Sequence, residues 1–173
     1  MFGLSFRFRS IAAVLLIAGF GIIPHWAAMA QTQGSGLPLP RYVSLRATEV
    51  NMRTGPGVQY PVEWIFQREY LPVEIIKEYR TWRLVRDSQG TQGWMHQSML
   101  SGKRTFLVTG KVRTIRARPD SNSRAIATIE PGAIGDLVSC PRGGGWCQVR
   151  AGGVEGWLRR VEFWGVYRNE AFE

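Results

Sequence analysis

Short runs in which apolar and polar residues alternate characterise this chain beyond its first 40 residues. Between positions 43 and 48, apolar side chains occupy every second position and polar ones lie between them. This period-two pattern predicts a half-buried β-strand. Two further apolar-rich runs, 73–76 and 82–85, are separated by a polar stretch. They predict a β-hairpin with residues 79–81 near its tip.

The same kind of pattern continues toward the C-terminus. An Asp-Ser-Gln-Gly turn at 87–90 links runs at 84–86 and 91–95, and comparable runs occupy 137–140, 146–150 and 154–158. Turn-forming residues between short apolar runs favour hairpins. Since no segment holds ten or more residues of 3.6-residue periodicity, we expect an all-β fold with at most a helical turn near 97–100.

Landmark residues recur at a spacing of 63 or 64 positions, which indicates a tandem duplication. We therefore expect one copy at residues 41–104 and a second at 108–168, followed by a tail at 169–173. Copies this small solve the problem of exposed strand edges by closing into barrels. The repeated pairs are Met52-Arg53 with Ile115-Arg116, Pro56 with Pro119, Trp82 with Trp146, and Gly93-Trp94 with Gly156-Trp157.

The first 30 residues have a different composition. Arg7 and Arg9 precede an uncharged apolar run at 11–23, and Ala28-Met29-Ala30 has the small-x-small pattern of a cleavage site. This arrangement predicts a cleavable signal peptide at 1–30, a periplasmic or secreted protein, and no stable membrane span after cleavage. The alternative is an uncleaved anchor. The polar and then Gly- and Pro-rich segment 31–40 predicts a flexible linker.

Two cysteines, Cys140 and Cys147, flank a Pro-Arg-Gly-Gly-Gly-Trp segment. Disulfides persist in exported proteins, and a loop rich in turn formers brings two strand ends within bonding range. We predict a disulfide that closes this hairpin. The cysteines have no ligand partners at zinc-site spacing, so no metal site is predicted.

The string Asn-Met-Arg-Thr-Gly-Pro-Gly at 51–57, a Trp before a strand at 82, and Gly-Trp-Met at 93–95 together resemble the bacterial SH3-like domain. In the second copy Thr114 replaces Asn51, and Arg118 and Asp120 replace Gly55 and Gly57. The resemblance implies two small SH3-like barrels of five to seven strands each. It also implies a binding module, directed in some members toward peptidoglycan and in others toward proteins.

Several repeated residues are expected to serve the fold. Arg53 and Arg116 occupy the same position in each copy, where a guanidinium can brace the carbonyls of the Gly-Pro turn. The alternative is a clamp for a ligand carboxylate. Gly55 and Pro56 are expected to shape that turn, Pro by fixing φ and Gly by permitting positive φ. Four repeated tryptophans are expected in the cores, namely Trp82, Trp94, Trp146 and Trp157.

The candidate ligand contacts are aromatic residues that the second copy lacks. Tyr60, Trp64, Tyr70 and Tyr79 have no aromatic counterparts there. We select Tyr60, Trp64 and Tyr79, together with Arg53, as the candidate binding set, with Trp64 as a groove wall. The alternative is that these rings are scattered over the surface or lie between the copies.

The formal net charge is +9, with 19 Arg and 3 Lys. It is interpreted as a solvated basic surface or as attraction to an anionic polymer or membrane. No catalytic set is evident, because His96 is the only histidine after residue 30 and a Cys–His nucleophile would need a partnered pair. The glycine-rich segment 142–146 lacks the Lys-Ser/Thr of a phosphate loop. We expect no cofactor and no nucleic-acid partner.

Together these patterns predict a non-enzymatic exported module that recognises cell-wall peptidoglycan, through either its stem peptides or its glycan. A protein-interaction adaptor in the cell envelope is the alternative. A third hypothesis is an accessory protein or inhibitor of a cell-wall hydrolase.

Overall fold

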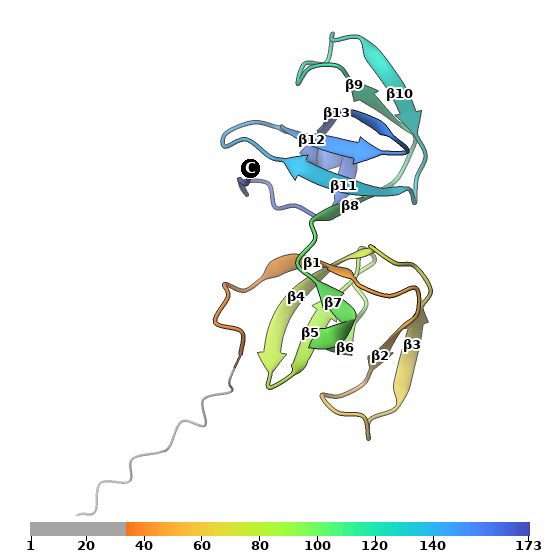
Figure 1. The fold of residues 1–173 in the computed structure, drawn as a ribbon, viewed down its shortest axis with the longest axis vertical. Coiled ribbons are helices and arrows are strands. Elements are labelled where there is room, and N and C mark those ends of the chain that lie inside the picture. The colour runs from red at the N-terminus through yellow and green to blue at the C-terminus, as the bar shows by residue number, and fades with distance from the viewer. Residues whose placement is uncertain (1–33) are drawn as a thin grey trace, which may run out of the picture. The chain divides into compact units, whose positions relative to one another are not determined.

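The computed structural model describes residues 34–173, which form strands and short 3-10 turns (Figure 1). The predicted signal peptide and residues 31–33 lie outside the described residues. Within residues 34–173, no helix is long and apolar enough to cross a membrane. The strands form two seven-stranded sheets, hereafter barrel one and barrel two, which confirms the all-β tandem architecture.

Barrel one has the strand order β3-β2-β6-β5-β4-β1-β7. A 3-10 turn, η1 (Gln97–Met99), precedes the last strand, where the sequence pattern allowed a short helical turn. The strands are β1 (Arg41–Leu45), β2 (Val50–Arg53), β3 (Val62–Phe66), β4 (Pro72–Tyr79), β5 (Trp82–Arg86), β6 (Gln92–His96) and β7 (Leu100–Ser101).

Barrel two repeats this order strand for strand, as β10-β9-β13-β12-β11-β8-β14. Its first strand begins at Thr105, and a second 3-10 turn, η2 (Arg160–Glu162), precedes its last strand. The strands are β8 (Thr105–Val108), β9 (Arg113–Arg116), β10 (Ala125–Ile129), β11 (Ile134–Ser139), β12 (Trp146–Ala151), β13 (Val154–Arg159) and β14 (Phe163–Trp164).

Each barrel has its own core of aliphatic residues and Phe, to which barrel one adds Met and barrel two adds the two cysteines. The prediction that the four repeated tryptophans fill these cores is wrong, because all four are only half-buried and lie outside both clusters. Alternation along the strands explains the difference. In β6, for example, Met95 is fully buried, so its neighbour Trp94 points to the other face.

Strand β1 also differs from the sequence prediction. It was expected to be half-buried, but Tyr42 and Ser44 are as inaccessible as Val43 and Leu45. The Tyr42 ring packs against two rings of barrel two, with centroid distances of 5.1 Å to Trp164 and 4.7 Å to Tyr167. The outward face of β1 is therefore covered rather than solvated.

Polar contacts accompany these rings between the barrels. The Glu74 carboxylate is only 2% exposed and accepts hydrogen bonds from the Tyr167 hydroxyl at 2.7 Å and from Arg86 Nε at 2.8 Å. The Thr105 hydroxyl donates to the Tyr70 carbonyl at 2.8 Å. Burial, and then the bond to Glu74, raise the pKa of Tyr167 far above its usual value. This phenol therefore remains a neutral donor.

The disulfide between Cys140 and Cys147 is confirmed, and both sulfur-bearing residues are fully buried. Cys140 also forms an antiparallel bridge with Phe172, so the C-terminal residues are joined to the same hairpin. Glu170 is paired with Arg104. The tail predicted at 169–173 is thus packed against barrel two.

Candidate binding site

The loop between β2 and β3 is braced by its own arginine. Arg53 Nη1 donates to the carbonyls of Tyr60 at 2.8 Å and Val58 at 3.2 Å. In barrel two, Arg116 Nη1 donates to the Ser123 carbonyl at 2.7 Å. Both arginines therefore make the loop contacts that the bracing hypothesis requires, and each keeps further N–H donors available.

The glycines of the Gly-Pro turn serve close packing. The expectation that they provide positive φ is wrong, because neither Gly55 nor Gly57 has a left-handed backbone. A Cβ on Gly55 would lie 2.4 Å from the Tyr60 ring. The ring of Tyr60 therefore lies on Gly55, where a larger residue would displace it.

A shallow groove lies beside this arginine in each barrel. In barrel one, the Arg53 groove encloses about 170 Å³ and is lined by Glu49, Asn51, Arg53, Val58, Trp82, His96 and Met99. In barrel two, the Arg116 groove encloses about 300 Å³ and is lined by Lys111, Val112, Arg113, Thr114, Arg116, Ser121, Trp146, Arg159 and Glu162. Most residues of the second set are the repeat equivalents of the first.

A larger cleft is walled by Trp64. This Trp64 cleft encloses about 360 Å³, and Phe66, Arg68, Asp87, Gln89 and Thr91 contribute further lining. The Trp64 side chain is 57% exposed. Asp87 Oδ1 accepts hydrogen bonds from the backbone N–H groups of Gln89 and Thr91, both at 2.9 Å. These bonds order the turn at 87–90, which supplies polar side chains to the Trp64 cleft.

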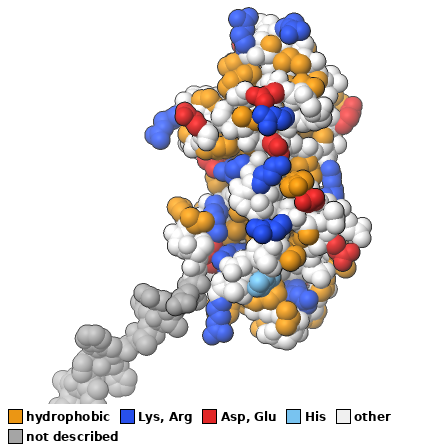
Figure 2. Space-filling view, in the orientation of Figure 1, with side chains coloured by type: hydrophobic (Ala, Val, Ile, Leu, Met, Phe, Trp, Pro, Cys, Tyr) orange, Lys and Arg blue, Asp and Glu red, His pale blue; other side chains and the backbone are white. Residues whose placement is uncertain are grey.

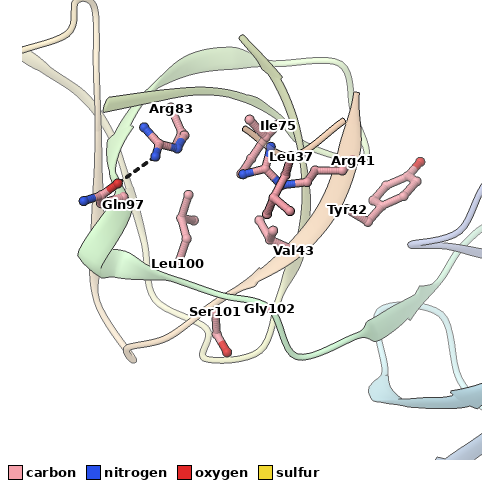
Figure 3. A pocket seen from close by; sticks show the side chains of 10 residues that line it. All are labelled: Leu37, Arg41, Tyr42, Val43, Ile75, Arg83, Gln97, Leu100, Ser101 and Gly102. Atoms are coloured by element: carbon pink, nitrogen blue, oxygen red, sulfur yellow. Dashed lines mark hydrogen bonds between the residues drawn. The ribbon is translucent and has the colours of Figure 1, made fainter. Parts of the chain in front are cut away.

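A fourth cavity, the Leu37 pocket, encloses about 320 Å³ (Figure 3). Its apolar lining comes from Leu37, Val43, Ile75 and Leu100. Arg83 reaches it from β5 and bonds to the Gln97 side chain at 2.6 Å. Leu37 belongs to the segment predicted as a flexible linker, and that segment thus contributes to the pocket.

The buried carboxylate of Glu78 fastens this N-terminal segment to β4. It accepts a hydrogen bond from the Ser35 hydroxyl at 2.8 Å and pairs with Arg41 at 2.7 Å and Arg83 at 3.1 Å. Burial raises the pKa of Glu78, but the hydrogen bonds from Ser35 and Arg41 outweigh it and hold the pKa below its usual value. Glu78 is therefore charged at neutral pH, and it neutralises arginines that line the Leu37 pocket.

The three aromatics selected from the sequence do not line one cleft. Trp64 walls the Trp64 cleft, whereas the Tyr60 ring lies on Gly55 and Tyr79 lies at the end of β4. Arg80 is stacked on the Tyr79 ring, 5.6 Å from its centroid. Arg53 lines its own groove. Tyr60, Tyr79 and Arg53 are therefore separate from the Trp64 cleft.

Two sets of lining residues were not predicted from the sequence, one in the Trp64 cleft and one in the Arg116 groove. The polar wall of the Trp64 cleft lies in the Asp-Ser-Gln-Gly segment, which was recognised only as a turn. The cations of the Arg116 groove could have been found from the repeat alignment, which places Arg113 opposite Val50 and Arg159 opposite His96. A change from Val and His to Arg at two aligned positions marks a difference in charge between the two grooves.

Metal-binding and thiol chemistry depend on His, Cys, Asp and Glu side chains. In residues 34–173, no three His, Cys, Asp or Glu side chains cluster as a metal site would require, and both cysteines are oxidised. On the face drawn in Figure 2, Lys and Arg side chains are spread over the surface.

Two barrels with one strand order, each with a braced loop and an adjoining groove, define a tandem small-barrel protein. The chain belongs to the bacterial SH3 domain family, whose model matches residues 46–102 and again residues 110–165. The two matches fall within barrel one and barrel two respectively and cover more than half of the chain. No protein of curated function matches the sequence.

Two solved structures are similar to the chain over part of their length. NlpC1 from Trichomonas vaginalis is 11% identical with a TM-score of 0.34, over 76% of this chain and 48% of that one. NlpC2 from Trichomonas vaginalis is 12% identical with a TM-score of 0.34, over 72% of this chain and 47% of that one. This chain thus spans about half the length of each.

Proposed function

We propose that the protein is a non-enzymatic binding module of the periplasm that recognises peptidoglycan and holds its glycan in the Trp64 cleft. The observation that carries the proposal is the exposed Trp64 ring facing a cleft with polar walls. Membership of the bacterial SH3 domain family supports a cell-wall role. A disulfide supports residence in an oxidising compartment.

The chemistry of the Trp64 cleft suits a sugar ring. An indole face stacks on the apolar face of a sugar, while planar polar side chains bond to the hydroxyl groups around its edge. Gln89 and Arg68 supply such side chains. Arg68 Nη2 already donates to the Gly132 carbonyl at 2.8 Å, which holds its guanidinium in place and leaves other donors available.

The experiment is retention on purified cell-wall sacculi, using residues 31–173, whose described part, 34–173, belongs to one compact unit. We expect the wild-type chain to be retained at moderate salt. Trp64→Ala removes an exposed ring, so the fold should persist while affinity falls about tenfold, equivalent to about 1.4 kcal/mol. Tyr79→Ala is the matched control, since it removes another exposed ring outside the cleft.

Two outcomes would contradict this proposal. Absence of wild-type retention on sacculi would refute peptidoglycan binding itself. Equal retention of wild type and Trp64→Ala would leave peptidoglycan as the ligand but remove the Trp64 cleft as its site.

A second candidate function, a protein-interaction adaptor in the envelope, is supported by strand β3. This strand ends the sheet order of barrel one and exposes Val62, Trp64 and Ile65 on its two faces. An exposed edge of this kind can accept a strand from a partner. Co-purification with an envelope protein, without retention on sacculi, would favour this function.

A further inference from the structure

The two grooves beside the braced arginines differ in charge. In the Arg53 groove the charges of Glu49 and Arg53 offset one another. The Arg116 groove holds four cations and one carboxylate, a net charge of +3, from Lys111, Arg113, Arg116, Arg159 and Glu162. The two grooves occupy equivalent places in the two copies of the fold, so the difference in their charge comes from substitutions at aligned positions.

Packing alone does not account for one of these cations. Arg113 begins β9 at the position where β2 has Val50, a fully buried core residue. The Arg113 Nε atom is buried and has no hydrogen-bond partner, while Nη2 donates to the Thr109 carbonyl at 3.1 Å. An unsatisfied buried donor costs roughly 1–3 kcal/mol, so a valine would serve the barrel better.

The other cations also keep donors free. Arg159 uses Nε and Nη2 on Glu162, at 3.1 and 3.0 Å, and Arg116 uses Nη1 on Ser123. Each guanidinium carries five N–H donors, so both retain some for a ligand. Among residues 34–173, Lys111 is exposed and has no ion-pair partner. The groove therefore presents several cationic donors on one cleft.

We propose that the Arg116 groove is a binding site for a phosphate monoester. Guanidinium forks bind phosphate oxygens in pairs. A groove with a net charge of +3 attracts the dianion of a phosphate monoester more strongly than the single negative charge of a carboxylate. The half-buried Trp146 lines the same cleft and would contact the organic part of the ester. The site is separate from the Trp64 cleft and stands independently of peptidoglycan binding.

A titration with three matched probes tests this site. The three probes share a sugar ring and differ in one substituent. Glucose 6-phosphate carries a phosphate, glucuronate carries a carboxylate, and glucose carries no charged group. At constant ionic strength, NMR shifts of the Trp146 indole N–H and the Thr114 amide should saturate with glucose 6-phosphate. Glucuronate should bind at least about tenfold more weakly, a difference of about 1.4 kcal/mol. Equal affinity for the two, or no saturation by glucose 6-phosphate, would overturn the proposal.

A double variant makes the test specific to the groove. Lys111→Thr/Arg113→Val installs the residues of barrel one at those positions, Thr48 and Val50, so barrel two should still fold. Glucose 6-phosphate affinity should fall at least about tenfold. Lys77→Gln/Arg142→Gln removes two exposed charges elsewhere and should have little effect. If the control weakens binding equally, the attraction is only non-specific. Lys111→Thr alone, at an exposed position, should show a smaller loss in the same direction.

A vesicle experiment identifies the source of the phosphate. Phosphatidylcholine vesicles with phosphatidic acid carry a lipid phosphate monoester, and vesicles of phosphatidylcholine alone do not. Binding to the first, lost in the double variant, would assign the groove to a lipid headgroup. Binding of glucose 6-phosphate without vesicle binding would assign it to a soluble phosphate ester.

Discussion

Gly156 in β13 lies against strand β9 with no room for a side chain. A Cβ at this position would lie 2.6 Å from Ile115 Cγ2 and 2.7 Å from the Arg116 carbonyl oxygen. Backbone cannot move aside as the end of a flexible side chain can. We predict that Gly156→Ala lowers the free energy of unfolding by about 1–3 kcal/mol.

Chemical denaturation of the variant and of a control measures this effect. Gly145→Ala is suitable, because a Cβ there meets nothing within 4 Å and the substitution restricts the unfolded chain. It should leave stability unchanged or slightly raised. Similar losses in both variants would contradict the packing explanation.

The positions of the repeated tryptophans could be aligned from the sequence, but their burial could not be predicted from it. The spacing of Trp82 and Trp146 was sufficient to align the copies. It was not sufficient to assign a face, because both faces of strands such as β5 and β6 carry apolar or aromatic residues. The structure decides the question by burying Val85 and Met95 instead.

At the scale of elements, the segment before β1 is fastened through Glu78. Because the folded-state pKa of Glu78 is lowered, its contribution to stability is complete above the unfolded value of about 4.3 and is lost as pH falls through the folded-state pKa. Glu78→Gln leaves Arg41 and Arg83 without this charge partner. It should cost on the order of 3 kcal/mol at pH 7.

The measurement is the difference in unfolding free energy between wild type and Glu78→Gln from pH 7 to pH 2. We expect the difference to be constant above about pH 4.3 and to shrink below it. Glu63→Gln changes an exposed carboxylate and should show almost no difference at any pH. A difference that grows on acidification would have the wrong sign for this explanation.

Some elements were readable from the sequence and others were not. The hairpin of β4 and β5 and the disulfide hairpin were predicted because turn residues separate clear apolar runs. Strands β3 and β10 were missed. Both end their sheets and are largely exposed, so neither has the alternation that burial on one face imposes.

At the scale of the whole described chain, Tyr42 joins the two barrels. Its ring is 7% exposed and packs on Trp164 and Tyr167. Truncation of a buried aromatic to alanine typically costs about 3–5 kcal/mol. We predict that Tyr42→Ala allows the barrels to tumble separately, while the wild-type chain tumbles as one body.

NMR relaxation of backbone amides gives the rotational correlation time of each barrel. The wild type should give one value, and Tyr42→Ala should give two shorter ones. Tyr79→Ala should behave as wild type. One shared correlation time in Tyr42→Ala would show that other contacts are sufficient to couple the barrels.

The candidate cleft illustrates why a site is harder to predict than a fold. Trp64 could be selected because it is an aromatic residue without a repeat counterpart. Gln89 and Thr91 belong to a different hairpin. They reach the same cleft because only β2 lies between β3 and β6 in the sheet. Strand patterns are local, whereas a cleft depends on contacts between distant segments.

The connection between the barrels has a consequence for avidity. Only residues 102–104 separate β7 from β8, and the Tyr42 contacts fasten the barrels together, so their grooves have a fixed spacing. When one part of a ligand binds in the Arg53 groove, the effective concentration of its other part at the Arg116 groove rises only if the two parts match that spacing. A duplicated barrel held in this way can select a polymer by the distance between its repeating units.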